Sequence, residues 1–218
     1  MEKSKWVISQ KWEHLVFLNY FTEPENVKKF LPKGIDLDLF EGKAYLTIVP
    51  FRMSRVRFPW TPYIPFSGLW ELNIRTYVEV NGVKGIYFFT LDTNHYLAAL
   101  IARKFFYLPY RSIKFYGNSI DKNLNYTSPS FKLSGEVGER KSKNNFERWI
   151  CERYHLFTTK NDKIYQGTAV HDPWEVHDFK IKHLDSSFLE SFDFKNCHFE
   201  NAFSGGELEV KFKPFEEL

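Results

Sequence analysis

The stretch ELNIRTYVEVNGVKGIYFFTLDTNHYLAALIARKFFYLPYR, residues 71–111, decides the fold. Two strand-like runs, 71–80 and 85–92, flank Asn81-Gly82, and this dipeptide is typical of a type I′ hairpin turn, which needs positive φ at both central residues. Apolar residues then recur at helical spacing, which predicts a helix over residues 95–106. Pro109 blocks further helix and directs Tyr110 and Arg111 towards the sheet.

The first of these strands carries polar groups at alternate positions. Glu71, Asn73, Arg75 and Tyr77 fall on one face, because side chains alternate between the two faces of a strand. We expect this face and the corner at Tyr110 and Arg111 to form the functional site.

Composition limits the class of protein. The 218 residues are 43% hydrophobic and 19% aromatic, with 23 Phe, so rings are expected to line the core or a cavity. A net charge of +3 is too small to indicate a nucleic-acid partner. The two cysteines, Cys151 and Cys197, form neither a disulfide framework nor a metal set. Residues 1–12 lack the apolar run of a signal peptide, and no stretch is long enough to span a bilayer, so we expect a cytoplasmic protein.

The remaining chain is mainly strand-like. We expect strands at 12–20, 35–39, 44–51, 112–118, 131–137, 147–159 and 163–171, and a last one after Gly206, with Asn161-Asp162 as a hairpin tip. Pro24 opens a short helix over 24–31, residues 120–130 are polar and weakly patterned, and 52–70 form a long proline- and aromatic-rich connection. With no repeat and no linker, the sequence predicts one domain over 1–218, of α+β class and mainly antiparallel.

Several motifs resemble those of a known family. In chain order they are FLNY (17–20), LPKGIDLD (31–38), GKAYLTIVPFRM (42–53), ELNIRTYVEVNGVKGIYFFTLD (71–92), ARKFFYLPY (102–110), ERYHLF (152–157) and HDPW (171–174). Together they resemble the YqjF-like family of uncharacterised bacterial proteins.

A second resemblance is more distant. NGVKGIYFFTLDTN (81–94), ARK (102–104) and PYR (109–111) are similar in order and spacing to the core of acetoacetate decarboxylase, and VKKFLPKGIDLD (27–38) also looks like part of that family. The resemblance implies a cone-shaped antiparallel β-barrel with a few helices, whose interior holds the site.

The departures from that family bear on the chemistry. The decarboxylase places two lysines after its proline; one forms an imine with the keto acid and the other lowers its pKa. Here these positions hold Tyr110 and Arg111, and neither side chain forms an imine under ordinary conditions. The match retains a site glutamate as Glu71, whereas a site arginine falls near Glu13 and is absent.

We therefore assign Glu71, Tyr110 and Arg111 as candidate catalytic residues and Asn73, Arg75, Arg103 and His171 as candidate substrate-binding residues. Guanidinium groups bind carboxylates in bidentate fashion, and Glu71 is placed to act as a base. The competing interpretation is an ion pair of Arg75 with Glu71 or Glu79 on a solvated face. Arg103 also fits a surface position, and His171 a structural one at the pocket rim.

Other devices fit less well. Asp92 and Asn94 are read as caps of the following helix. His171, His177 and His183 recur every six residues, which is not a metal-binding spacing, so no metal and no cofactor is expected. The sequence has no nucleophile elbow, Walker loop or dinucleotide fingerprint.

Two functions remain. One is a barrel that binds a small organic acid or another anion, with lyase or hydrolase activity that needs no imine. The other is a non-catalytic binding or structural protein, or a homo-oligomer, that uses the aromatic residues Phe58, Trp60, Tyr63, Phe66 and Trp70, beside Phe51, as a contact surface or as a plug. A cavity of several hundred Å³ is expected for the first, and a filled interior for the second.

Overall fold

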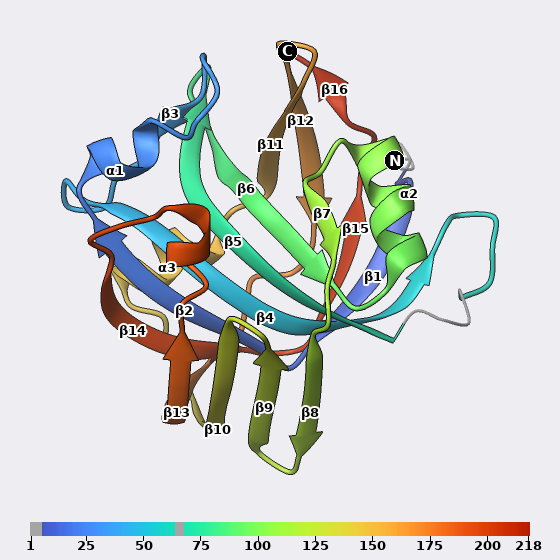
Figure 1. The fold of residues 1–218 in the computed structure, drawn as a ribbon. Coiled ribbons are helices and arrows are strands. Elements are labelled where there is room, and N and C mark those ends of the chain that lie inside the picture. The colour runs from blue at the N-terminus through green and yellow to red at the C-terminus, as the bar shows by residue number, and fades with distance from the viewer. Residues whose placement is uncertain (1–5, 64–67) are drawn as a thin grey trace.

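The computed structural model describes residues 6–63 and 68–218. Phe66 and the first five residues lie outside this part of the chain. Figure 1 shows a strongly curved sheet. The described residues also form three helices and one 3₁₀ turn. The elements are β1 (Ile8–Glu13), β2 (Leu15–Thr22), α1 (Pro24–Lys28), β3 (Asp36–Leu37), β4 (Ala44–Arg57), β5 (Leu69–Val80), β6 (Val83–Thr93), α2 (Tyr96–Phe106), β7 (Tyr110–Ser112), β8 (Tyr116–Ile120), β9 (Asn123–Ser128), β10 (Phe131–Lys141), α3 (Asn145–Cys151), β11 (His155–Lys160), β12 (Lys163–Val170), β13 (Val176–Ser186), η1 (Glu190–Phe192), β14 (His198–Gly205), β15 (Leu208–Phe212) and β16 (Glu216–Glu217).

The sheet is mainly antiparallel, as expected. Its order is β3-β5-β6-β11-β12-β15-β1-β4-β2-β14-β13-β10-β9-β8, and β6 makes parallel pairings with β11 and β7. β4 also pairs with β5 over eight residues, so the sheet returns on itself around an interior. The joints β6–β11 and β12–β15 are each only two residue pairs long. The strands therefore surround an interior, while a fully closed cone stays a prediction.

The central unit matches its prediction closely. Asn81 and Gly82 have φ of 52° and 80°, as a type I′ turn requires, and join β5 to β6. The predicted helix is α2. Asp92 and Asn94 do not cap it, which corrects that interpretation: the side chain of His95 accepts the hydrogen bond from the Ala98 N–H.

Other boundaries differ from the predictions. The predicted strand 12–20 is two strands, β1 and β2, separated at His14, whose φ is 54°. The predicted strand 147–159 is α3 followed by β11, because Asn144 and Glu147 form a capping box. The weak segment 120–130 holds β9, β14 was not foreseen, and β4 runs to Arg57 into the supposed connection.

The two faces of β4 and β5 enter different cores. Leu46, Ile48, Leu72 and Ile74 pack in an outer cluster that includes Phe131. β9, β10 and the segment around η1 contribute to this cluster, together with Val27 of α1. The opposite face looks into the interior, where an aromatic-rich cluster contains Phe51, Tyr77 and Trp174. Alternation along β5 thus delivers its polar side chains to the interior.

Helix α2 lies at one side of the sheet (Figure 1) and contacts β7 and β6. Only Ala99 is fully buried in it, although it also sends Ala98, Ala102 and Phe106 to the interior. None of the helices in the described part of the chain has the length and hydropathy that crossing a bilayer requires.

Candidate functional site

A cavity of about 170 Å³ lies inside the curved sheet. β5 contributes Glu71, Asn73 and Arg75 to its wall, and these side chains are 2%, 3% and 9% exposed. The interpretation of this face as a solvated ion pair is therefore wrong. The cavity is smaller than the several hundred Å³ expected of a ligand pocket, but the interior is not filled.

Glu71 is held by two hydrogen bonds. The hydroxyl of Tyr110 donates to Oε2 at 2.7 Å and the amide of Asn73 donates to Oε1 at 3.2 Å. Burial raises the pKa of Glu71 to about 7, although both hydrogen bonds oppose the shift. Burial, with Glu71 beside it, also raises the pKa of Tyr110. A carboxyl with a pKa near neutral pH is well suited to act as a general acid or base.

Arg75 brings a positive charge into the cavity. Among the described residues, no carboxylate lies within ion-pair distance of its guanidinium, and its buried Nε lacks a hydrogen-bond partner. The guanidinium lies 5.0 Å from the ring of Phe17 and 5.8 Å from that of Tyr77. The neighbouring Asn73 Oδ1 is also buried without a partner. Buried polar groups are normally satisfied, so these atoms indicate a place for a polar ligand group.

A chain of hydrogen bonds holds Tyr77, whose ring lies beside the guanidinium of Arg75. Tyr77 shares a 2.7 Å hydrogen bond with Thr47, which donates to Asn19 Oδ1 at 2.9 Å. Asn19 in turn donates to Asn201 at 2.9 Å. The chain fixes the Tyr77 ring against which the guanidinium of Arg75 lies.

The end of α3 supplies further cavity residues. Arg153 lines the cavity, but its charge is compensated by Asp38 at 2.7 Å. Cys151 lines it as a thiol whose pKa burial raises to about 12, so it is not a thiolate. His171 lines it too; burial lowers its pKa, and its ring packs 4.8 Å from that of Tyr154. Arg75 is therefore the cation in the cavity wall that has no carboxylate partner among the described residues.

Two predicted residues lie elsewhere. Arg111 does not line the cavity: β7 runs parallel to β6 with Arg111 opposite Asp92, and the guanidinium binds that carboxylate at 2.7 and 2.5 Å. Arg103 lies on an open groove on the other side of Leu108, and it donates to the Tyr110 carbonyl at 3.4 Å. The expected convergence of Arg111 with Glu71 is therefore not seen.

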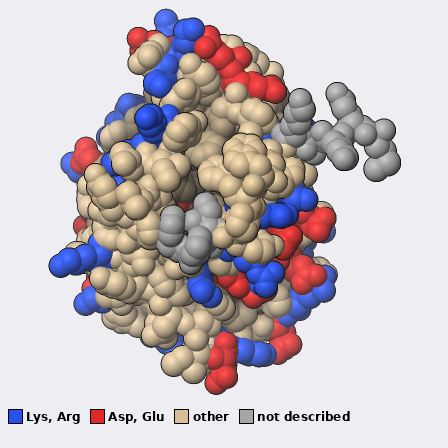
Figure 2. All heavy atoms as spheres, turned by 90° about the vertical axis from the view of Figure 1, so that its right-hand side faces the viewer, with Lys and Arg blue, Asp and Glu red and all other residues tan. Residues whose placement is uncertain are grey.

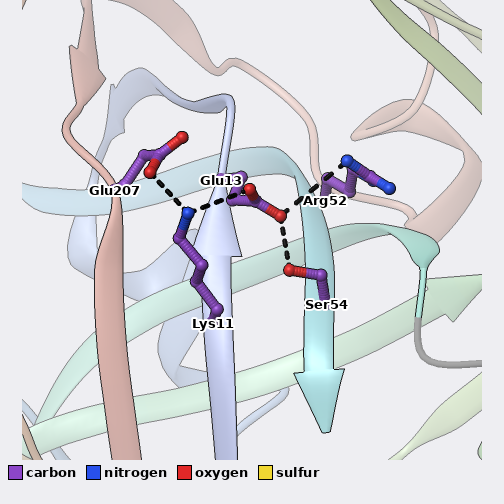
Figure 3. Close-up of polar contacts among 5 residues, drawn as sticks. All are labelled: Lys11, Glu13, Arg52, Ser54 and Glu207. Atoms are coloured by element: carbon purple, nitrogen blue, oxygen red, sulfur yellow. Dashed lines mark hydrogen bonds and ion pairs between the residues drawn. The ribbon is translucent and has the colours of Figure 1, made fainter. Parts of the chain in front are cut away.

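Glu13, which falls near the missing arginine of the decarboxylase, also points away from the cavity. Figure 3 shows it between Lys11, Ser54 and Arg52, with Lys11 bound in addition to Glu207. The Lys11–Glu207 distance is 2.5 Å. This cluster links β1 to β4 and to the start of β15, while Gln10 and Trp12 face the cavity.

The described aromatic residues of 51–63 and 68–70 lie in three different environments. Phe51 and Phe58 line the cavity, whereas Trp60 and Tyr63 are 79% and 51% exposed. Trp70 packs outside against Tyr126. Sequence reasoning did not pick out Gln10, Trp12, Cys151 or His155, because their positions in the cavity depend on pairing between distant strands. In the described ranges, no group of three His, Cys, Asp or Glu side chains forms a metal site.

The fold belongs to a recognised class. It is similar to an acetoacetate decarboxylase-like enzyme from Sphingomonas wittichii RW1, with a TM-score of 0.70, 10% identity and coverage of 97% of this chain and 93% of that one. It is also similar to the enduracididine biosynthesis enzyme MppR (TM-score 0.69, 10% identity, 97% and 87% coverage) and to acetoacetate decarboxylase of Legionella pneumophila (TM-score 0.67, 11% identity, 96% and 86% coverage). The chain therefore has the acetoacetate decarboxylase-like fold.

The family follows from the sequence. Residues 9–204 match the model of DUF2071, described as an uncharacterized conserved protein, and the chain belongs to this family. It is 34% identical to the uncharacterized protein YqjF of Bacillus subtilis strain 168 over 184 residues, which are 78% of this chain and 74% of YqjF.

Proposed function

We propose that this protein binds a small organic carboxylate in the cavity and acts on it with Glu71 as the proton-transfer group. The observation that carries the proposal is the buried guanidinium of Arg75, which faces the cavity and has no carboxylate partner among the described residues. A buried charge costs several kcal/mol unless it is compensated, and a bidentate carboxylate compensates it. Asn73 adds an unpaired acceptor for a hydroxyl or amide group of the ligand.

Glu71 supplies the reactive group on the polar face of β5. With a pKa of about 7 it is partly protonated at neutral pH, so it can either give or take a proton. Tyr110 orients its Oε2 and occupies the position that carries the imine-forming lysine in the decarboxylase family. The proposed chemistry is a lyase or hydrolase reaction with general acid–base catalysis.

The lining residues support a mechanism without an imine. The described residues around the cavity include no lysine. Borohydride treatment in the presence of a 2-oxo or 3-oxo acid is therefore expected to leave the protein mass unchanged, as mass spectrometry of the intact chain would show. A reduced adduct on any lysine would contradict this part of the proposal. The structurally similar enzyme MppR has been solved in complex with pyruvate.

Binding is tested with carboxylates and their uncharged amides. Calorimetric titration of a panel from propionate to benzoate, against propionamide to benzamide, is expected to show a preference for the acids. Arg75→Met is expected to weaken acid binding about 10- to 100-fold, because a charge-assisted bidentate contact contributes about 1.5–3 kcal/mol.

The matched control is Arg140→Met, since Arg140 is exposed on β10 and pairs with Glu175 on the surface. It should leave acid binding unchanged. Equal affinity for acids and amides, or no effect of Arg75→Met, would contradict the proposed function.

A second candidate is an interaction protein. The outer face of α2 exposes Tyr96, Leu97, Leu100 and Phe105, and Trp60 is exposed as well. Apolar exposure of this kind is typical of contact surfaces. Light scattering across a concentration series tests it: a stable oligomer whose mass falls in Leu97→Glu favours this candidate, and a monomer at all concentrations opposes self-association.

A further inference from the structure

The composition of the cavity wall restricts the ligand further than its charge does. Apart from the polar residues, the wall consists of rings and aliphatic groups from β1, β4, β15, α2 and the residue after β4, represented by Trp12, Phe51, Phe58, Phe106 and Phe212. Figure 2 looks onto the side of the molecule that carries α2, where uncharged residues surround a hollow. The cavity wall is thus polar along β5 and where Arg153, His155 and His171 reach it, and apolar over most of the rest.

Trp12 presents its ring rather than its donor. Its indole N–H donates to Gln10 at 2.9 Å, so that hydrogen-bonding group is already satisfied. The ring itself is held by Phe51 at 5.5 Å, Trp174 at 6.0 Å and Phe212 at 6.2 Å. An ordered apolar surface of this kind favours an apolar group and leaves a polar one without hydrogen bonds.

The size of the cavity sets the size of that group. A cavity of about 150 Å³ lined by aliphatic and aromatic side chains holds one benzene ring. The volume here is about 170 Å³, which fits a single ring or a chain of about five carbons together with a carboxylate.

We infer that the ligand is a monocarboxylic acid with one apolar tail, an aryl group or a medium alkyl chain, whose carboxylate binds Arg75. The inference rests on the proposed function and specifies its substrate class. A short polar acid leaves the apolar wall unfilled. A dicarboxylic acid of equal length places a second charge against Trp12 and its neighbours, where the described wall offers no further uncompensated cation.

Titration calorimetry with acids of increasing length tests the inference. From propionate to hexanoate the affinity is expected to rise roughly fourfold per added methylene, or about 60-fold in total. Benzoate is expected to bind at least as well as hexanoate, and adipate at least tenfold more weakly than hexanoate.

A variant that fills the apolar side sharpens the test. Ala98 lines the cavity from α2, and leucine is a good helix former, so Ala98→Leu is expected to fold. It should weaken hexanoate and benzoate binding at least tenfold and change propionate binding less than twofold. Leu100→Ala, on the exposed side of the same helix, is the control and should change none of these values.

The outcomes separate the two proposals. Flat affinity from propionate to hexanoate, or adipate binding as well as hexanoate, with Arg75 still required, overturns the tail inference and leaves the carboxylate site standing. Loss of the preference for acids over amides overturns both.

Discussion

Glu71 and Arg75 lie on the same face of β5, yet burial affects their charges differently. The pKa of the Glu71 carboxyl rises to about 7, so the side chain can be protonated and uncharged within the physiological pH range. A guanidinium remains protonated in proteins, so Arg75 keeps its charge and needs a partner. One residue is thus suited to move a proton and the other to bind an anion.

The pKa of Glu71 predicts a pH-dependent stability. A folded-state pKa above the unfolded value of 4.5 stabilises the fold below pH 4.5, and this contribution is lost as the pH rises through 7. We therefore compare the unfolding free energy of Glu71→Gln with that of wild type at two pH values. The variant minus wild-type difference should be about 2 kcal/mol higher at pH 8 than at pH 5.5, because only the wild type loses stability over this range. Urea unfolding at both pH values measures it.

The control for this experiment is Glu13→Gln. The pKa of Glu13 is lowered by its hydrogen bonds to Ser54 and Lys11, which outweigh the effect of burial, so it stays ionised at both pH values. Its difference from wild type should not change between pH 5.5 and 8. A flat difference for Glu71→Gln as well would show that Glu71 does not titrate near 7.

Arg111 gives a second prediction at this scale. Arg111→Gln leaves the fully buried Asp92 without its cation, although Thr90 still donates to it at 2.6 Å. Because the Arg111 side chain is 48% exposed, we expect a loss of about 1–2 kcal/mol in unfolding free energy, less than for a fully buried pair. Benzoate binding, measured by calorimetry, should change less than twofold. A tenfold loss of benzoate affinity would instead indicate that Arg111 takes part in ligand binding.

At the scale of elements, the pairing of β6 with β11 is only two residue pairs long, Ile86 with Leu156 and Tyr87 with Phe157. Gly85 lies beside it, and an added Cβ there would lie 2.6 Å from the His155 carbonyl oxygen and 2.7 Å from the Phe157 ring. Only glycine permits this approach, because the backbone oxygen cannot move independently of the strand.

Gly85→Ala is therefore expected to lower the unfolding free energy by about 2–3 kcal/mol, as overpacking does in a tight core. Gly68→Ala is the comparison, since its added Cβ would meet only the flexible Arg52 guanidinium at 3.3 Å. Thermal unfolding of both variants should show a clearly larger shift for Gly85→Ala. Similar shifts would mean that the β6–β11 joint contributes little.

The elements that the sequence predicts well are those with local signals. Asn81-Gly82 determines its own turn, and the apolar spacing of 96–106 determines α2. In contrast, 147–159 alternates enough to resemble a strand, and the Asn144–Glu147 capping box that starts α3 was overlooked. β9 has a weak signal because Leu124 and Tyr126 are its two apolar residues and the other four are polar.

The site follows the same division. The shared face of Glu71, Asn73 and Arg75 follows from strand alternation, and the structure confirms that they line one cavity. The direction of Arg111 depends on the register of β7 against β6, which places it opposite Asp92. Trp12 and Gln10 enter the cavity through the pairing of β1 with β4 and β15, which no local pattern encodes.

At the scale of the whole molecule, the sheet separates an outer hydrophobic core from an inner cavity. The outer core of β4 and β5 is filled by β9, β10 and the residues near η1, whereas the inner one retains the cavity. A ligand that binds this cavity binds the folded state alone, so it should raise the unfolding free energy by about 2.7 kcal/mol at a concentration of 100 Kd. Urea unfolding with and without benzoate checks this value, and equal midpoints would show that the ligand does not bind the folded protein.

The central claim is that a carboxylate binds Arg75 inside this cavity. A crystal structure with 4-bromobenzoate, in which anomalous scattering locates the bromine, tests it most directly. We predict that the carboxylate lies within hydrogen-bond distance of the Arg75 guanidinium and that the bromine lies against the apolar wall beside Trp12. A carboxylate bound elsewhere, or a bromine at the Arg75 end, would contradict the account.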